Sequence, residues 1–205
     1  KLILLLFFLF SVHIVLNAQE TTPGPAYRKI GLTYSVSGNN DVFRYDELEG
    51  AAGISGLSFY SIGICFVHPI NKWLESETGI EYSRHDILIH PNVPPDMDQT
   101  PQEASFSLIN IPISVRANFL RFFFINIGAM VDIDASTSHV IDSQAGIGAL
   151  MGVALKHDFG FGVSVFVNPY AKIHSLLPFS QGQHHQRVYE SDFRLGMSYK
   201  FSKAS

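Results

Sequence analysis

Long stretches of this chain alternate between apolar and polar residues with a period of two. Tyr189 and Phe193 of the stretch 189–201 share one face, whereas Glu190 and Arg194 share the other. Because successive side chains of a β-strand point to opposite faces, the alternation predicts strands that separate an apolar environment from a polar one. The alternating stretches run for about 9 to 16 residues, longer than the five or six typical of soluble strands and sufficient for a tilted membrane strand.

The same alternation predicts eight strands. They lie near residues 28–36, 55–68, 73–88, 106–118, 122–134, 146–157, 160–173 and 189–201. Short turns near 68–72, 118–121 and 157–160 alternate with long polar links near 37–54, 89–104, 135–145 and 174–188. Short turns at one end and long loops at the other are typical of outer-membrane barrels. We therefore expect an all-β fold, an eight-stranded antiparallel up-and-down transmembrane β-barrel that occupies residues 19–205, with both chain ends on the short-turn side.

The apolar faces of these strands are expected to contact lipid. Every backbone polar group must be paired within the protein in a bilayer, so a spanning sheet has to close into a barrel. Eight strands enclose an interior that side chains fill, which predicts no wide water channel. The residues that this reading places outside include Ile109, Ile111, Ile113 and Phe123.

Charged residues fall on the inward faces and can be matched by sign. Buried charges persist only when they are paired, so we expect a salt-bridged plug in the barrel. The pairing that we predict joins Glu77 and Glu81 to Arg116 on the neighbouring strand, with Arg194 in the same network. A narrow proton or ion path is the alternative reading. Other inward charges are Glu75, Lys156 and Lys200.

Aromatic residues near the strand ends predict girdles at the two membrane interfaces. Tyr82 and Tyr189 are candidates for the long-loop side. The candidates for the short-turn side are Trp73, Phe119, Phe122, Phe159, Tyr199 and Phe201.

The first residues have the pattern of a secretory signal peptide. Residues 1–16 are apolar except for Lys1, Ser11 and His13, and a small residue, Ala18, precedes a polar one. A membrane-spanning helix, the competing reading, needs roughly 20 apolar residues. We therefore expect residues 1–18 to be removed on export, which would deliver the mature chain to the outer membrane.

Charge and cysteine content exclude several classes of protein. The net charge is −4 and the isoelectric point is about 6.1, which does not suit a nucleic-acid-binding protein. Cys65 is the only cysteine, so the chain has no intrachain disulfide and no cysteine-based zinc site. It also lacks the cysteine that would anchor a lipoprotein directly after the signal.

Two segments resemble a known family. The first is the run 108–113 (LINIPI), which is followed by an arginine, a turn and a strand that starts with aromatic residues and carries an inward glycine. The residues that carry the resemblance are Ile109, Ile111, Pro112, Phe123 and Gly128. In this it resembles the small outer-membrane barrels of Bacteroidetes known as PorT-like or outer-membrane β-barrel domain proteins. The last strand resembles the aromatic-ended strand that barrel-assembly machinery recognises in Gram-negative bacteria, which would give Phe201 the role of terminal assembly signal.

Histidine and serine residues are the candidates for chemistry. Ser138 precedes His139, and His174 precedes Ser175, but adjacent strand residues point to opposite faces, so neither pair makes a dyad. His174, His184 and His185 share a link that is rich in glutamine, and loop polarity explains them without a metal. The proline-rich acidic link 89–104 reads as a stiff exposed loop. We therefore expect no catalytic, metal or cofactor site.

These observations leave three hypotheses for function. The first is a non-enzymatic barrel with a structural, anchoring or interaction role, whose partners are outer-membrane lipid, the assembly machinery and proteins that meet its extracellular loops. The second is a lipid-modifying enzyme of the outer leaflet. The third is a soluble, lipocalin-like ligand-binding barrel, which requires the outward residues named above to be packed inside.

Overall fold

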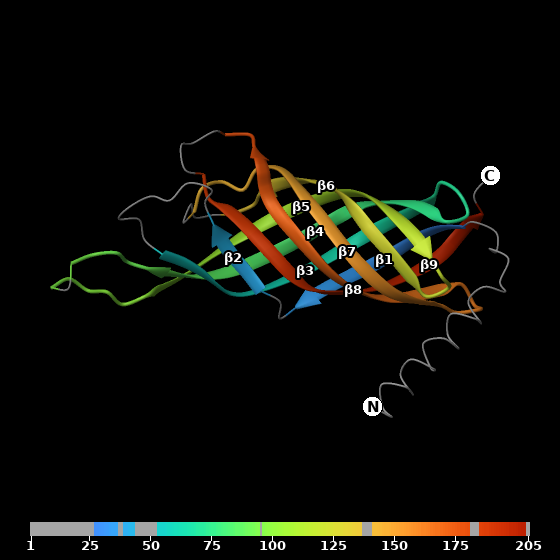
Figure 1. Ribbon diagram of the computed structural model, residues 1–205, viewed down its shortest axis with the longest axis horizontal. Helices are drawn as coiled ribbons and strands as arrows, with labels where there is room; N and C mark the ends of the chain where they lie inside the picture. Colours follow the sequence, from blue (N-terminus) through green and yellow to red (C-terminus); the bar gives the residue numbers. More distant parts are fainter. Residues whose placement is uncertain are drawn as a thin grey trace, which may run out of the picture.

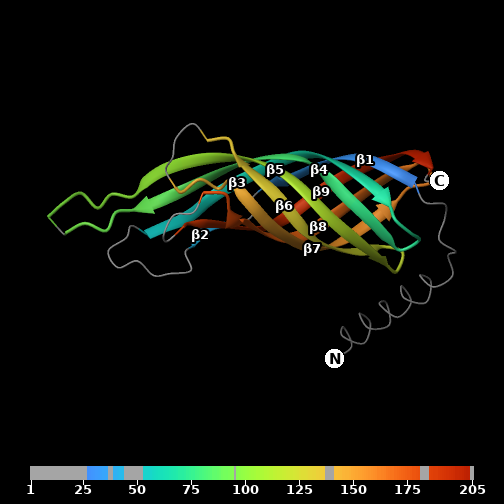
Figure 2. The same cartoon turned by 90° about the horizontal axis from the view of Figure 1, so that it is seen from above.

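In the part of the chain that the structure describes, nine antiparallel β-strands form one closed sheet (Figures 1 and 2). The computed structural model describes residues 27–36, 39–43, 53–94, 96–136, 141–180 and 185–203. The strands are β1 (Tyr27–Val36), β2 (Asn39–Phe43), β3 (Gly53–Pro69), β4 (Leu74–His90), β5 (Gln102–Phe119), β6 (Phe123–Asp134), β7 (Gly146–Asp158), β8 (Val163–Pro178) and β9 (Arg187–Lys203). From β3 onward each strand pairs with the next, and β1 pairs with both β3 and β9, which closes the ring.

The predicted up-and-down barrel is confirmed, but it has one strand more than the eight expected. The additional strand is β2, which was predicted to be part of a loop. Ser35 of β1 lies opposite Arg194, and Asn39 of β2 lies opposite Ser191. β2 therefore continues along β9 where β1 stops, and the two short strands share one position in the barrel.

The start of β1 and the end of β9 lie side by side at one end of the barrel, since Tyr27 is opposite Lys203. We call this end, with the turns 70–73, 120–122 and 159–162, the short-turn end. At the other end, the long-loop end, the described connections are 91–94 with 96–101, 135–136 with 141–145, and 179–180 with 185–186.

The strands extend further into the long-loop end than predicted. The hairpin of β4 and β5 projects beyond the rest of the barrel (Figure 1). β8 runs to Pro178 and β9 starts at Arg187, so the two ends of the link predicted at 174–188 belong to strands. This difference places His174 within a strand.

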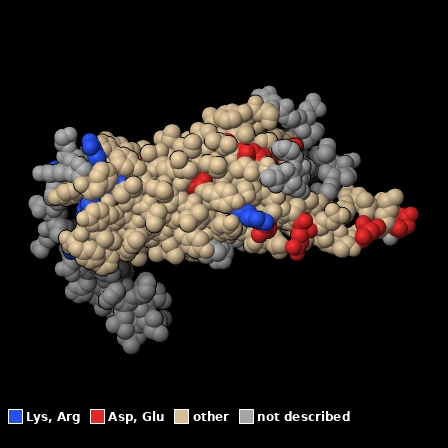
Figure 3. Space-filling model, turned by 180° about the vertical axis from the view of Figure 1, so that it is seen from behind, with Lys and Arg blue, Asp and Glu red and all other residues tan. Residues whose placement is uncertain are grey.

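The outer wall is apolar. The relative exposures of Ile80, Ile113 and Ile127 are 60%, 61% and 62%, and the neighbouring outward positions are also aliphatic or aromatic. Charged groups in Figure 3 gather at the two ends and leave most of the wall between them uncharged. Ile109, Ile111 and Phe123 are partly exposed on the same faces. A soluble ligand-binding barrel would bury these positions, so the third hypothesis is wrong.

Exposed aromatic rings surround the short-turn end. Trp73, Phe119, Phe159, Tyr199 and Phe201 are all exposed. Several of them pack against one another, such as Phe119 and Phe123, whose ring centroids are 5.8 Å apart. Phe122, also predicted here, is half-buried, and its ring stacks on His157. Towards the long-loop end, Tyr82 and Tyr189 are exposed as expected.

The predicted signal peptide, residues 1–18, lies outside the described residues. Among the residues that the structure does describe, there is no helix of the length and apolarity needed to cross a membrane.

Candidate functional site in the barrel interior

The barrel interior holds charged groups from the short-turn end to the long-loop end. At the short-turn end, Lys29 Nζ lies 3.2 Å from Glu75 Oε1 and 3.9 Å from Asp158 Oδ1. Lys156 Nζ lies 3.8 Å from the other oxygen of Asp158. Lys200 is half-buried near the ring of Tyr27. This layer therefore holds three ammonium groups and two carboxylates.

The middle layer centres on Glu77. The Arg116 guanidinium donates to Glu77 Oε2, and Arg194 Nη1 lies 3.1 Å from Glu77 Oε1. All three side chains are buried. The Arg116 guanidinium also lies 4.6 Å from the ring centroid of Phe124 and 5.0 Å from that of Phe166. The rings therefore fix the guanidinium in place from the side that the carboxylate does not cover.

The next layer pairs Glu81 differently from the prediction. Glu81 accepts from Lys172 of β8, which lies across the barrel, and not from Arg116. The register explains the difference: Arg116 is opposite Glu75 on β4, whereas Glu81 is opposite Asn110, further towards the long-loop end. The period-two pattern predicts which side chains point inward. It does not predict which inward side chains on different strands lie at the same height along the barrel axis.

Lys172 and Glu190 connect this layer to a histidine cluster. Lys172 Nζ lies 3.2 Å from Glu190 Oε1, which also accepts from the Tyr170 hydroxyl. The other oxygen, Glu190 Oε2, lies 3.1 Å from His174 Nε2 and 3.7 Å from His85 Nε2. These side chains are all buried.

Each imidazole of the cluster is held from a second side. His174 Nδ1 lies 3.2 Å from Asp132 Oδ1. The His85 ring is stacked between Phe59 and Phe106, with centroid separations of 5.3 Å and 4.9 Å. The two rings therefore present their Nε2 atoms to one carboxylate oxygen from fixed positions.

His174 and His185 correct the expectation of a polar surface loop. The relative exposure is 0% for His174 and 6% for His185; His184 lies outside the described residues. β8 extends through His174, which has the same inward parity as Lys172. Next to it the pairing of β7 with β8 is irregular: Ile147 is opposite Leu177, but Ala149 is opposite Ile173, so residues 174–176 of β8 face a single residue of β7. The two additional residues in β8 let Ser175 point inward beside His174, which the rule of alternating faces does not allow.

Ser175 occupies a strained position in this bulge. Its φ is 49°, in the left-handed region that non-glycine residues seldom adopt. Gly148 lies opposite, and a Cβ there would come within 2.6 Å of the carbonyl oxygen of Ile173. A side chain at 148 would therefore push the bulge away from the barrel wall.

Ser175 pairs with His185 and not with its neighbour His174. Ser175 Oγ lies 3.1 Å from His185 Nε2, and both are buried. Burial lowers the pKa of His185, Asp142 opposes the shift, and Arg187 adds to it. Asp142 also accepts from the backbone N–H of Gln186, which ties the connection after β6 to the connection before β9.

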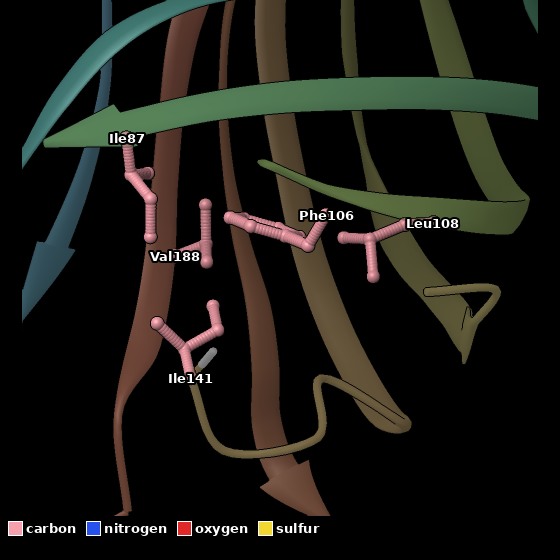
Figure 4. Packing of buried hydrophobic residues seen from close by; sticks show 5 residues of the cluster. All are labelled: Ile87, Phe106, Leu108, Ile141 and Val188. Atoms are coloured by element: carbon pink, nitrogen blue, oxygen red, sulfur yellow. The ribbon is translucent and has the colours of Figure 1, made fainter. Parts of the chain in front are cut away.

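An apolar cluster closes the interior above the histidines at the long-loop end. Its members come from strands and from a loop, and Figure 4 shows them facing a common centre. Phe106, which stacks on His85, belongs to it, so the cluster and the polar network are continuous. The buried residues of this apolar cap are Ile87, Phe106, Leu108, Ile141 and Val188.

The middle of the barrel leaves little free space between the residues that the structure describes. The gap bordered by Glu81, Asn110 and Lys172 has a volume of about 10 Å³, room for about one water molecule. Paired charges fill the lumen below it, and the apolar cap closes it above. A larger hollow of about 700 Å³, lined by Leu32, Ile62 and Leu155, lies on the apolar outer wall.

Sequence reasoning found the inward charges but missed the histidine cluster. His85, Asp132 and Glu190 come from three different strands, and only the closed barrel brings them to His174. One signal was present: each of these three residues falls on an inward position of an alternating strand. Predicting their contact required the axial register, which the pattern does not provide.

The fold is similar to that of solved outer-membrane barrels. The crystal structure of the outer membrane protein OprG from Pseudomonas aeruginosa aligns with a TM-score of 0.53 at 10% identity, covering 87% of this chain and 97% of that chain. The translocator domain of autotransporter NalP from Neisseria meningitidis aligns with a TM-score of 0.35 at 10% identity, covering 94% of this chain and 95% of that chain. The KdgM porin aligns with a TM-score of 0.26 at 12% identity, covering 84% of this chain and 99% of that chain. Both align too loosely to carry an argument. No family model and no curated protein matches the chain. The likeness to OprG shows the barrel fold alone.

Proposed function

We propose that this protein is an integral outer-membrane barrel with a structural, anchoring or interaction role and no wide pore. The observation that carries the proposal is the filled lumen: the layers around Glu77 and Glu190 are buried and paired, and the apolar cap covers them. The apolar outer wall supports a place in lipid, since a closed ring pairs its backbone groups internally.

The surfaces that remain for partners are the two ends. The β4–β5 hairpin projects furthest at the long-loop end, where acidic groups gather in Figure 3. We propose that protein partners bind there, that lipid covers the wall, and that Phe201, exposed near the end of β9, is read by the barrel-assembly machinery. Membership of the PorT-like family of Bacteroidetes belongs to the same proposal and rests on the residues around Pro112 and Phe123.

Fractionation and conductance together test the proposal. The full chain, expressed in a Gram-negative host, should sediment with the outer membrane and migrate faster on gels before boiling than after it. The purified barrel in a planar bilayer should give no stable open-channel current. Large, lasting conductance steps would contradict the closed barrel, and absence from the outer-membrane fraction would contradict the location.

A second candidate function, hydrolysis of an outer-leaflet lipid, is favoured by one observation. Ser175 Oγ lies 3.1 Å from His185 Nε2, a serine–histidine pair on a strained turn of backbone. Because burial lowers the pKa of His185, its ring is neutral near pH 7 and can accept a proton from the hydroxyl. Ser175 is fully buried, so a substrate would reach it only if the side chains above it moved.

A fluorophosphonate probe separates the two candidates. An enzyme of this kind should label at Ser175 in outer-membrane fractions and lose the label in Ser175→Ala, whereas Ser164→Ala, at the short-turn end, should keep it. The non-enzymatic proposal predicts no labelling of any of the three proteins. Labelling that depends on Ser175 would overturn it.

A further inference from the structure

The histidine cluster has the donor set and the spacing of a metal site. His85, His174 and Glu190, on three different strands, each place one ligand atom within 4.8 Å of the other two. Glu190 Oε2 contacts the Nε2 atoms of both imidazoles. Two imidazoles and one carboxylate are the protein ligands of a common class of zinc site, and the same donors suit other divalent transition metals.

The separations from the carboxylate oxygen fit one ion. Zinc bonds of 2.0–2.2 Å in tetrahedral geometry place two ligand atoms about 3.3 Å apart. Glu190 Oε2 lies 3.1 Å from one imidazole nitrogen and 3.7 Å from the other, which brackets that value. The ligand atoms of the two imidazoles lie within 4.8 Å of each other, so binding one ion requires the rings to approach by at most about 1.5 Å.

The groups around the ligands are those that support a metal site. Asp132 Oδ1 lies 3.2 Å from His174 Nδ1, so a proton on Nδ1 would be held by the carboxylate and Nε2 would be left free to ligate. The stacked rings of Phe59 and Phe106 hold His85 in its orientation. On Glu190, Tyr170 and Lys172 contact Oε1 and leave Oε2 facing the imidazoles.

The local charge also calls for a cation. Asp132, Glu190 and Glu81 contribute three carboxylates to the connected cluster, and Lys172 is the ammonium that contacts Glu81 and Glu190. The neighbouring layer adds one surplus guanidinium, since Arg116 and Arg194 share the single carboxylate of Glu77. With both imidazoles neutral, one negative charge remains in a buried setting, where unpaired charge is costly. A bound cation would compensate it.

We propose that His85, His174 and Glu190 bind one divalent transition-metal ion, of the zinc class, inside the long-loop end of the barrel. The ion joins β4, β8 and β9 beneath the apolar cap, and binding displaces any proton carried by the two Nε2 atoms. Because the cap and the paired charges enclose the site, the ion enters as the barrel folds, and its binding free energy stabilises the closed end. The rival arrangement is a metal-free one, in which a protonated His174 bridges Asp132 and Glu190.

The test begins with the unmodified barrel, refolded in detergent with zinc and then passed through a chelating column. It should retain about one zinc ion per chain, measured by elemental analysis. Refolded with cobalt, it should show the visible absorption of a low-coordinate site with nitrogen and oxygen ligands. A barrel that retains no zinc and shows no cobalt band overturns the proposal, whatever the variants do.

Variants assign the metal to the cluster. His174→Gln and Glu190→Gln should weaken zinc binding by at least about tenfold, and Asp132→Asn, which supports His174, by about 10- to 100-fold. His90→Gln is the matched control, since His90 is exposed at the same end of β4. Equal zinc affinity in His174→Gln and His90→Gln would place the metal elsewhere and overturn the proposal. Should His174→Gln fail to refold, Asp132→Asn and the cobalt spectrum still decide.

Discussion

At the scale of single residues, the charged side chains in the middle of the barrel are both buried and paired. Removing an ion from water costs several kcal/mol, and a buried pair recovers this only with close geometry. Glu77 achieves it by accepting from Arg116 while Arg194 approaches its second oxygen at 3.1 Å. Loss of this one carboxylate therefore strands two cations.

Glu77→Gln should lower the free energy of unfolding by about 3–5 kcal/mol, because it leaves two buried guanidinium groups without their counter-charge. Urea titration in detergent can follow this through the fluorescence of Trp73, the only tryptophan. Glu103→Gln, exposed near the start of β5, is the control and should change little. Equal effects of the two substitutions would mean that the Glu77 network contributes nothing specific.

His185 should make the long-loop end sensitive to acid. Its pKa is lowered in the folded protein, so the unfolded segment, with a pKa near 6.5, binds a proton first as the pH falls. The stability that depends on neutral His185 is present above pH 6.5 and is lost as the pH falls towards the folded pKa.

Hydrogen exchange can test the predicted loss of stability at low pH. After correction for intrinsic rates, amides in 141–145 and 185–187 should exchange faster at about pH 5 than at about pH 7.5, relative to the turn 70–73. His185→Gln should remove the difference. A pH effect of the same size in that variant would show that another group is responsible.

At the scale of strands, alternation in the sequence predicted the inner and outer faces but not the defects. On β9, Leu195 and Met197 face outward and Arg194 faces inward, as their parity requires. The bulge at Ser175 and the short β2 could not be read in this way. The bulge adds two residues to β8 and turns Ser175 inward against its parity, and β2 is a polar segment that is a strand only because β9 offers it a partner. The histidine cluster was hidden for another reason: its residues all have inward parity, but their contact depends on the axial register of four strands.

Gly196 of β9 lies where the barrel interior is closely packed. A Cβ at this position would come within 2.1 Å of the Phe166 ring, which lies beneath both Arg116 and Arg194. Gly196→Ala should force the ring to shift and cost about 1–3 kcal/mol of stability, measured by the same urea titration. Gly160→Ala is the control, since a Cβ there meets nothing within 4 Å. A harmless Gly196→Ala would mean that the ring can move freely.

At the scale of the whole molecule, the barrel has its polar and apolar sides reversed relative to a soluble protein. Carboxylates and cations occupy the interior, while aliphatic side chains such as Ile127 and Ile113 form the outer wall. Aromatic rings surround the short-turn end, and the acidic long-loop end lies opposite (Figure 3). Such a distribution is stable only when an apolar phase surrounds the wall.

Arginine substitutions on the outer wall can test whether a bilayer surrounds it. Ile127 lies midway along β6 and Ile133 near its long-loop end, on the same face. In a bilayer, Ile127→Arg should cost about 2–4 kcal/mol, because a charge at the membrane midplane loses its hydration, whereas Ile133→Arg should cost about 0–1 kcal/mol at the interface. Unfolding titrations in lipid vesicles give both values. In water both arginines would be solvated and the depth dependence would vanish, so equal costs in vesicles would contradict a membrane-spanning barrel.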